Sequence, residues 1–190
     1  AAAGGLEVRG VMGYEGHLMM VEPEAVRKAQ TEEAMKHLLA AGADVGGDLV
    51  SGGGTGTYAV NTWVNEIQAG SYTLMDTAYE QLGLPFEQAL FVLGRVISTS
   101  EEWAVADVGL KSLSLDHGLP RVDGYDVWFC SDEHTTLRRL EGGRELPSVG
   151  ERLRVAPSHV DPTVALHDVM YLVDGDDVLE EWPIDMRGWR

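Results

Sequence analysis

The sequence predicts an α/β region followed by an antiparallel β domain. In residues 1–85, strand-like apolar runs alternate with segments of helical periodicity, which is typical of parallel strands joined by crossover helices. From residue 86 onward, short β-rich runs alternate with turn residues, which is typical of antiparallel sheets. We therefore expect two domains, residues 1–85 and residues 86–190.

The α/β region is expected to begin with an apolar strand over about residues 6–12. A helix follows over residues 23–44, with Pro23 in its first turn and Gly42 as its stop. Helical spacing predicts that its apolar face consists of Val26, Met35, Leu38 and Leu39.

Residues 65–83 complete the α/β region. They suggest a strand, a turn at Gly70-Ser71 and a helix that ends at Gly83. Near Leu84-Pro85 the pattern changes to that of the second domain.

The β domain is predicted from a series of short runs. The last run contains Asp174-Gly175 between two apolar stretches, which is a strong hairpin signal. The runs are ALFVLGRVIST, EWAVADVG, LKSLSLD, YDVWFCSDEH, ERLRVAPSHV and DVMYLVDGDDVLEEWPI.

Charge and composition exclude several classes of partner. The chain carries 14 Lys+Arg against 31 Asp+Glu, for a formal net charge of -17. So acidic a surface repels nucleic acid and anionic membranes, because phosphate binding depends on cationic side chains. No apolar run approaches the roughly 18 residues of a membrane span. A single cysteine, Cys130, excludes an intrachain disulfide framework and leads us to expect a reducing cytoplasm.

Two glycine-containing loops are candidate anion sites. Residues 51–58, SGGGTGTY, follow an expected strand, and clustered glycines let backbone N–H groups approach a phosphate closely. No lysine follows, so this is not a nucleoside-triphosphate P-loop. The second loop places Gly70 and Ser71 after the next expected strand. Both loops would open at the same edge of a parallel sheet, whereas the alternative for each is an ordinary flexible turn.

His159 and Asp161 form a candidate metal site. In an extended segment, residues two apart point to the same side, so an imidazole and a carboxylate would face one spot. This pair suits a divalent metal such as Mn²⁺ or Zn²⁺ and leaves coordination positions open. The alternative is a surface His-Asp pair beside a proline turn. His167 and Asp168 are either supporting polar residues or ordinary hairpin residues.

Two further polar segments are candidates for the site. Tyr14 and His17 follow the first strand, where a cofactor contact or a proton-transfer group is expected at the end of a parallel strand. The alternative is a helix cap and a loop residue. Residues 131–136, SDEHTT, form an acidic loop that either approaches the metal or is a solvated turn.

Taken in order, these segments resemble the C-terminal half of the family of D-threonine aldolases and D-serine dehydratases, pyridoxal-phosphate enzymes related in fold to alanine racemase. The resemblance rests on RGVMGYEGH, VSGGGTGTY, NEIQAGSYTLMD, ADVGLKSLSLDHGLP, SDEH and PSHVDPTVALHD. It implies the last strands and helices of a (β/α)8 barrel followed by the antiparallel β domain. It also implies a homodimer.

The resemblance assigns roles to individual residues. Pyridoxal 5′-phosphate would be held by Tyr14, Gly54, Thr55, Gly70 and Ser71. His159 and Asp161 would bind a divalent metal, with Mn²⁺ preferred and Mg²⁺, Co²⁺ or Zn²⁺ as alternatives. Because D-serine dehydratases of this family tend to carry cysteine at the second metal position, Asp161 favours the aldolase branch.

The implied reaction is cleavage of D-threonine or a related D-β-hydroxy-α-amino acid to glycine and an aldehyde. Pyridoxal phosphate accepts the electrons left at Cα, and the metal lowers the pKa of the β-hydroxyl group. His17 and His159 are the catalytic candidates. His159 acts through the metal, and either His17 or a metal-bound water removes the proton.

The family's Schiff-base lysine has no credible counterpart here. The lysines are Lys28, Lys36 and Lys111, and none falls on the strand that carries it in the family. We therefore expect the chain to need an N-terminal half of the same enzyme. A D-serine dehydratase and a noncatalytic metal- or phosphate-binding module are the alternatives.

Overall fold

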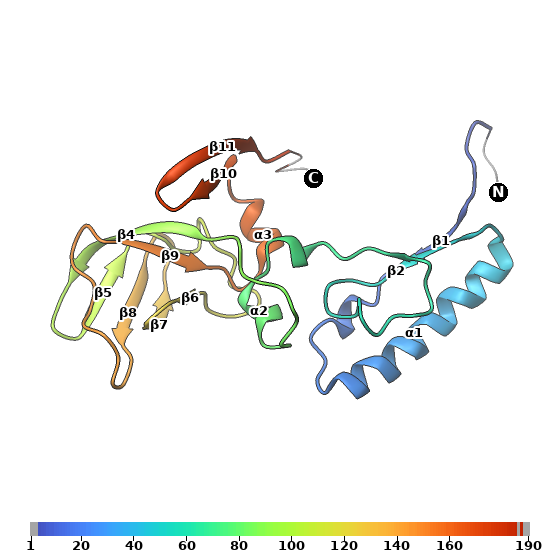
Figure 1. The fold of residues 1–190 in the computed structure, drawn as a ribbon, viewed down its shortest axis with the longest axis horizontal. Helices are drawn as coiled ribbons and strands as arrows, with labels where there is room; N and C mark the ends of the chain where they lie inside the picture. Colours follow the sequence, from blue (N-terminus) through green and yellow to red (C-terminus); the bar gives the residue numbers. More distant parts are fainter. Residues whose placement is uncertain (1–3, 186, 188–190) are drawn as a thin grey trace. The chain divides into compact units, whose positions relative to one another are not determined.

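The computed structural model describes residues 4–185 and residue 187. The chain divides into two compact units. Unit 1 consists of Ala1–Thr73 and Gln81–Phe86, and unit 2 consists of Leu74–Glu80 and Glu87–Arg190. Figure 1 shows the elements of both units along the chain. Among the described residues, no helix is long and apolar enough to span a membrane.

Unit 1 contains a three-stranded parallel sheet in the order β1-β2-β3. Its strands are β1 (Gly10–Gly13), β2 (Leu49–Gly52) and β3 (Glu66–Ile67). The pairing confirms the expected parallel strands, with Gly10 opposite Leu49 and Ser51 opposite Glu66. The first strand starts later than residue 6, and the (β/α)8 barrel to which it was assigned stays a prediction.

Helix α1 (Glu24–Val45) crosses from β1 to β2 and lies within one residue of the expected range at each end (Figure 1). Gly42 is not its stop. Gly42 lies inside the helix, and a Cβ there would come within 3.2 Å of the Val11 side chain, so this glycine admits close packing of the helix on β1. The helix ends at Gly46, whose φ of 79° favours glycine.

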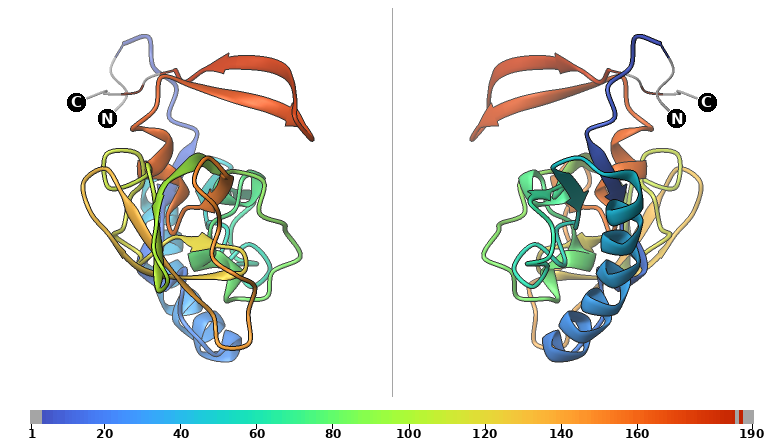
Figure 2. Two further views of the ribbon diagram at one scale, coloured as in Figure 1. Left: turned by 90° about the vertical axis from the view of Figure 1, so that its left-hand side faces the viewer. Right: turned by 90° about the vertical axis from the view of Figure 1, so that its right-hand side faces the viewer.

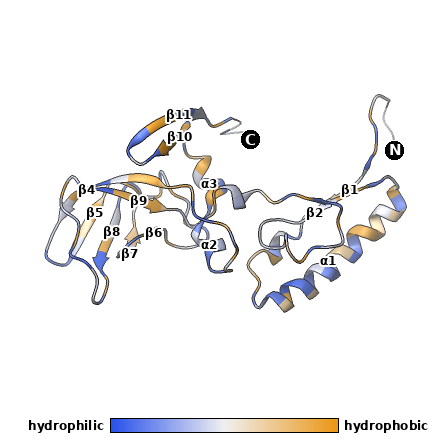
Figure 3. Ribbon diagram, in the orientation of Figure 1, coloured by the Kyte–Doolittle hydropathy of each residue, from blue (hydrophilic) through white to orange (hydrophobic). Residues whose placement is uncertain are grey.

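The buried face of α1 also differs from the predicted one. Met35 is buried as expected, but Val26 and Leu39 are 41% and 39% exposed. The buried residues are Arg27, Thr31 and Met35, which lie one helical turn apart. Arg27 is buried because its guanidinium group donates to the carbonyl of Val21 and lies near two glutamates. Figure 3 shows the mixed polarity of this helix.

The prediction of one helix that ends at Gly83 is wrong. After Gly70 the chain forms a short 3-10 helix, η2 (Ser71–Thr73), and later a separate short helix, α2 (Thr77–Glu80). Met75 adopts a φ of 55° between them, which no α-helix permits. The backbone therefore changes direction within the segment that was predicted as one helix.

Unit 2 contains a closed antiparallel barrel in the order β4-β5-β8-β7-β6-β9, which confirms the predicted antiparallel domain. Its interior is filled by apolar side chains from most of the strands, including Val96, Ala104, Val122, Leu137 and Val155. The strands are β4 (Val92–Thr99), β5 (Trp103–Ala106), β6 (Arg121–Val122), β7 (Tyr125–Cys130), β8 (Thr135–Arg139) and β9 (Arg152–Ala156).

The prediction of a strand over residues 110–116 is wrong. The segment forms turns, because Ser112 N and Leu113 N both donate to the carbonyl of Gly109. The apolar character of the segment comes from Leu113, which is 1% exposed and packs into the barrel core. The segment therefore works as a loop that covers the barrel core.

A short helix and a hairpin end the chain. Helix α3 (Val160–Val164) follows β9, and strands β10 (Val169–Asp174) and β11 (Asp177–Pro183) pair in an antiparallel hairpin (Figure 2). Gly175 has a φ of 60° in the turn, which confirms the hairpin predicted from Asp174-Gly175.

Candidate functional site

The glycine loop of unit 1 is held by a buried carboxylate that the sequence did not reveal. Glu15 follows β1, precedes the 3-10 helix η1 (Gly16–Leu18) and is 1% exposed. Its Oε2 accepts a hydrogen bond from Gly53 N at 3.2 Å, and its Oε1 accepts one from Thr57 Oγ1 at 2.7 Å. The Asn61 amide donates to Oε1 at 2.9 Å. The end of β1 therefore fixes the loop that follows β2.

The two predicted phosphate loops meet in the structure. The backbone N–H of Tyr72 donates to Thr55 Oγ1 at 3.0 Å, and this bond joins the loop at Gly54-Thr55 to the loop at Gly70-Ser71. Clustered glycines, hydroxyl groups and loop backbone amides are the groups that hold a phosphate in proteins. The chemistry of these residues fits the phosphate of pyridoxal 5′-phosphate.

Tyr14 lies over the glycine loop, whereas His17 faces α1. A Cβ at Gly54 would come within 2.9 Å of the Tyr14 ring, so the ring and the loop backbone are in close contact. His17 lies in η1, is exposed and lines a largely apolar surface groove beside α1. The roles of Tyr14, Gly54, Thr55, Gly70, Ser71 and His17 toward a cofactor stay predictions.

In unit 2, His159 and Asp161 lie near each other, but not for the predicted reason. His159 is extended, with φ of -144° and ψ of 118°, and is the N-cap of α3. Asp161 lies in the first turn of that helix rather than on the same extended segment. The His159 Nε2 atom still lies 3.5 Å from Asp161 Oδ2. The pair therefore forms at a strand-to-helix junction.

Buried hydrogen bonds fix this junction. Asp76 is fully buried; its Oδ2 accepts from Val160 N at 2.9 Å, and its Oδ1 accepts from Tyr79 N at 3.0 Å. Thr163 Oγ1 donates to the carbonyl of His159 at 2.7 Å. These contacts hold the backbone on both sides of the imidazole.

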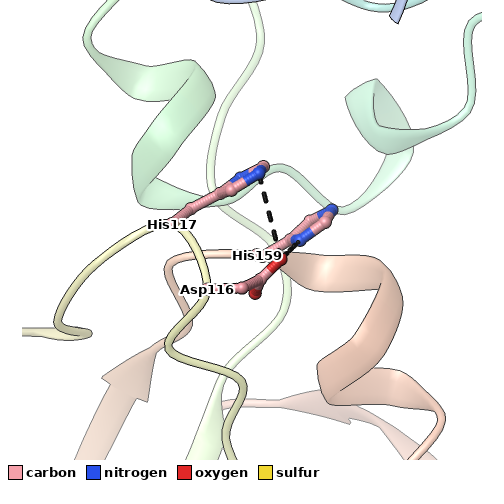
Figure 4. Close-up of side chains that lie close together, drawn as sticks. All are labelled: Asp116, His117 and His159. Atoms are coloured by element: carbon pink, nitrogen blue, oxygen red, sulfur yellow. Dashed lines mark hydrogen bonds and ion pairs between the residues drawn. The ribbon is translucent and has the colours of Figure 1, made fainter. Parts of the chain in front are cut away.

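Asp116 is a second partner of His159 that the sequence did not single out. Its Oδ2 lies 2.6 Å from His159 Nδ1 (Figure 4). Partial desolvation acts to raise the pKa of Asp116, but hydrogen bonds from Ser114 and His159 outweigh it and lower the pKa below its usual value. The carboxylate is therefore ionised and is placed to accept a hydrogen bond from Nδ1 of His159.

His117 completes a cluster with Asp116 and His159 whose potential ligand atoms lie within 4.8 Å of one another. The rings of His117 and His159 are stacked, with centroids 3.9 Å apart and planes inclined by 7° (Figure 4). The lone pairs of imidazole nitrogens lie in the ring plane, so stacked rings do not aim at one ion. His117 therefore covers His159, whereas Asp161 is the better second ligand.

The separation of the two ligand atoms agrees with metal binding. Two ligands that each lie about 2.1 Å from one ion are roughly 3.0–3.4 Å apart in octahedral or tetrahedral geometry. The observed 3.5 Å between His159 Nε2 and Asp161 Oδ2 is close to this range. The distance between this imidazole nitrogen and this carboxylate oxygen is therefore compatible with two ligands of one divalent cation.

The remaining polar candidates have other partners. His167 Nε2 contacts the carbonyl of Ser112 at 2.9 Å, which is a structural contact. In the SDEH segment, Glu133 pairs with Lys111 at 2.5 Å, and Ser131 N donates to the carbonyl of His134. This segment is a turn between β7 and β8.

Comparison with known proteins finds a matching family model and several similar enzymes. The family model described as a putative serine dehydratase domain matches residues 89–173. The chain is 37% identical to 3-hydroxy-D-aspartate aldolase of Paracoccus denitrificans (strain Pd 1222), over 99% of this chain and 53% of that protein. It is 35% identical to D-threonine aldolase of Arthrobacter sp, over 97% and 53%.

The chain is similar over almost its whole length to the C-terminal half of these aldolases, and residues 89–173 match the putative serine dehydratase domain. It corresponds to the C-terminal half of these proteins and spans about half the length of the curated relatives that it matches. The names of these relatives are those of lyases, because they are aldolases of D-threonine or 3-hydroxy-D-aspartate.

Solved structures of family members share the fold. The crystal structure of D-threonine aldolase from Filomicrobium marinum is 37% identical, with a TM-score of 0.84 over 94% of this chain and 53% of that one. The D-threo-3-hydroxyaspartate dehydratase from Delftia sp. HT23 is 25% identical, with a TM-score of 0.79 over 97% of this chain and 57% of that one. A solved structure described as an ala racemase-like protein from Idiomarina loihiensis shares the fold, with 23% identity and a TM-score of 0.78 over 92% of this chain and 55% of that one.

Proposed function

We propose that the enzyme containing this chain is a metal-activated, pyridoxal-phosphate-dependent aldolase. Its substrates would be D-threonine and related D-β-hydroxy-α-amino acids, and its products glycine and an aldehyde. The observation that carries the proposal is the pairing of His159 with an aspartate, Asp161, at 3.5 Å in a chain 37% identical to an aldolase of this family. The proposal extends to a (β/α)8 barrel around β1–β3, a homodimer and a cytoplasmic location.

Unit 1 would hold the cofactor. Gly54, Thr55, Gly70 and Ser71 would contact the phosphate, because the loops that carry them are joined by the Tyr72 N to Thr55 Oγ1 bond. Tyr14, in contact with Gly54, would lie beside the cofactor. When bound, pyridoxal phosphate supplies an electron sink for the carbanion at Cα.

Unit 2 would hold the metal, with Mn²⁺ preferred. His159 Nε2 and Asp161 would be the ligands, and Asp116 would accept a hydrogen bond from Nδ1 and so orient the imidazole. Two protein ligands would leave coordination positions open, and a metal held there would supply a Lewis acid for the substrate's β-hydroxyl group. The hydrogen bond from Val160 N to Asp76 holds the backbone next to His159.

The lysine of the Schiff base is proposed to lie in the part of the enzyme outside this chain. Lys36 pairs with Glu33 at 2.5 Å, and Lys111 pairs with Glu133 at 2.5 Å, both on exposed surfaces. Lys28 is an exposed residue of α1. All three lysine side chains are therefore exposed to solvent and do not lie at the proposed cofactor site.

A dehydratase is the second candidate. It is supported by the match to the putative serine dehydratase domain and by 27% identity to D-threo-3-hydroxyaspartate dehydratase of Delftia sp. (strain HT23). This enzyme would use the same residues, but the β-hydroxyl group would leave as water or hydroxide instead of becoming a carbonyl.

Product analysis separates the two reactions. The enzyme, supplied with pyridoxal 5′-phosphate and Mn²⁺, is incubated with D-threonine and with 3-hydroxy-D-aspartate. Formation of glycine and an aldehyde in equal amounts supports the aldolase. Formation of a 2-oxo acid and ammonia without glycine would assign the dehydratase. Absence of both product pairs, with metal binding retained, would favour a noncatalytic binding module.

A further inference from the structure

Glu15 is a buried carboxylate to which the proposed reaction gives no role. It lies between β1 and η1, and its side chain is 1% exposed. Its hydrogen-bond donors at Gly53, Thr57 and Asn61 all come from the segment that forms and follows the glycine loop. A buried carboxylate is costly unless several donors satisfy it, so this contact set holds one arrangement of the loop in preference to others.

The contacts extend into the loop through Thr57. The Thr57 hydroxyl donates its proton to Glu15 Oε1 at 2.7 Å and accepts a hydrogen bond from Gly54 N at 3.2 Å. The backbone amides of Gly53 and Gly54 are therefore directed into the protein, so in the proposed site Gly54 would contact the phosphate through the close approach of its side-chain-free Cα and not through its N–H. Gly53 has a φ of 78°, a conformation that favours glycine and that this hydrogen bond helps to hold.

We propose that Glu15 is the positioning residue of the glycine loop. By holding the N–H groups of Gly53 and Gly54 on the protein side, directly and through Thr57, it sets the loop in its phosphate-binding conformation before the cofactor arrives. The inference rests on the proposed function, in which this loop takes the phosphate of pyridoxal 5′-phosphate. Preorganisation of this kind increases affinity because the loop pays no ordering cost on binding.

The consequence is specific to the phosphate group. A residue that only stabilised unit 1 would affect the binding of pyridoxal and of pyridoxal 5′-phosphate equally. A residue that positions the phosphate loop affects only the phosphorylated cofactor. The ratio of the two dissociation constants therefore separates positioning from general stability.

The test compares Glu15→Gln with the wild-type enzyme and with Glu32→Gln. In Glu15→Gln the new side chain would keep the size of the glutamate, but its amide nitrogen cannot accept the Gly53 N–H. Glu32→Gln removes an exposed carboxylate from α1 of the same unit and serves as the matched control. The dissociation constants of pyridoxal 5′-phosphate and of pyridoxal are measured on each apoenzyme, and hydrogen exchange of the loop amides is measured without cofactor.

We expect Glu15→Gln to weaken pyridoxal 5′-phosphate binding about tenfold, as the loss of one charge-assisted hydrogen bond implies, and to leave pyridoxal binding within about twofold. The Gly53 and Gly54 amides should exchange faster. An unchanged ratio of the two constants in the folded variant would overturn the inference. If Glu15→Gln does not fold, the same ratio is measured for Thr57→Val, and an unchanged ratio there has the same meaning.

Failure of the proposed function gives a different result. If the wild-type enzyme binds pyridoxal and its phosphate equally well, the loop takes no phosphate, and both the cofactor assignment and the role of Glu15 are overturned. If the wild type prefers the phosphate and Glu15→Gln keeps the same preference, only the role of Glu15 is overturned.

Discussion

The Nδ1 atom of His159 lies 2.6 Å from the Oδ2 atom of Asp116, on the opposite side of the imidazole from Asp161. Asp161 Oδ2 lies 3.5 Å from Nε2. A carboxylate on one nitrogen fixes the tautomer, so the other nitrogen is available to a metal. Asp116, a loop residue of the β domain, thus contacts the imidazole of the proposed ligand pair His159 and Asp161.

Substitution of Asp116 tests this link. Asp116→Ala is expected to lower the affinity for Mn²⁺ about 10- to 100-fold, because the imidazole loses the acceptor that fixes its tautomer and orientation. The affinity for Mn²⁺ should fall less in Asp116→Asn, since the amide oxygen of the new side chain still accepts a hydrogen bond. Calorimetric titration measures the affinity, and Asp126→Ala, an exposed aspartate of β7, is the control. Unchanged affinity in Asp116→Ala would contradict the orienting role.

His117 should be dispensable for metal binding. Because its ring stacks on His159 at 3.9 Å, its nitrogens do not converge on the ion that Nε2 of His159 would bind. We expect His117→Ala to keep Mn²⁺ affinity within about threefold, whereas His159→Ala should lose it by at least about 100-fold. A comparable loss in both variants would show that His117 is a ligand.

Asp76 should contribute to stability and to the site together. Asp76→Ala leaves the N–H groups of Tyr79 and Val160 without their acceptor in a fully buried position. The free energy of unfolding is expected to fall by about 2–3 kcal/mol, measured by urea denaturation. Asp126→Ala should change it by less than about 0.5 kcal/mol. If the free energy of unfolding falls no more in Asp76→Ala than in Asp126→Ala, the hydrogen bonds of Asp76 do not stabilise this junction.

Cys130 should react slowly at neutral pH. Burial raises the pKa of its thiol and outweighs the opposing hydrogen bond with Thr135. Because the folded pKa lies above the unfolded one, the stability that comes from the neutral thiol is present below the unfolded pKa and is lost as pH rises through the folded pKa. We expect alkylation by iodoacetamide to be slower than in the urea-unfolded chain and to accelerate only at more alkaline pH. Equal alkylation rates of the folded and the urea-unfolded chain at neutral pH would contradict the protection of Cys130 by burial.

Much of the fold was predictable from local patterns. The antiparallel character of residues 86–190 and the hairpin at Asp174-Gly175 follow from turn residues and alternating polarity, and both are observed. The end of α1 and the helix after Gly70 were not predictable in the same way. Gly42 stays helical because it packs against Val11, and Met75 breaks the helix although methionine favours one. Both depend on tertiary contacts.

Proximity was predictable for candidate residues that are close in the sequence. His159 and Asp161 lie near each other as their spacing predicted, although a strand-to-helix junction rather than one strand brings them together. Asp116 lies 43 residues away from His159 and Glu15 lies 38 residues away from Gly53, so no local pattern connects either pair. Glu15 carried one signal, which was its place between two predicted cofactor-site residues at the end of a parallel strand.

The most direct test of the account is the Mn²⁺ dependence of glycine formation from D-threonine. The enzyme is stripped with a chelator, saturated with pyridoxal 5′-phosphate and titrated with Mn²⁺, and the same is done for Asp161→Ala. We expect that the stripped wild type is inactive, that Mn²⁺ restores glycine formation, and that Asp161→Ala needs at least about 100-fold more Mn²⁺. Full activity after stripping, or the same Mn²⁺ requirement in Asp161→Ala, would contradict it.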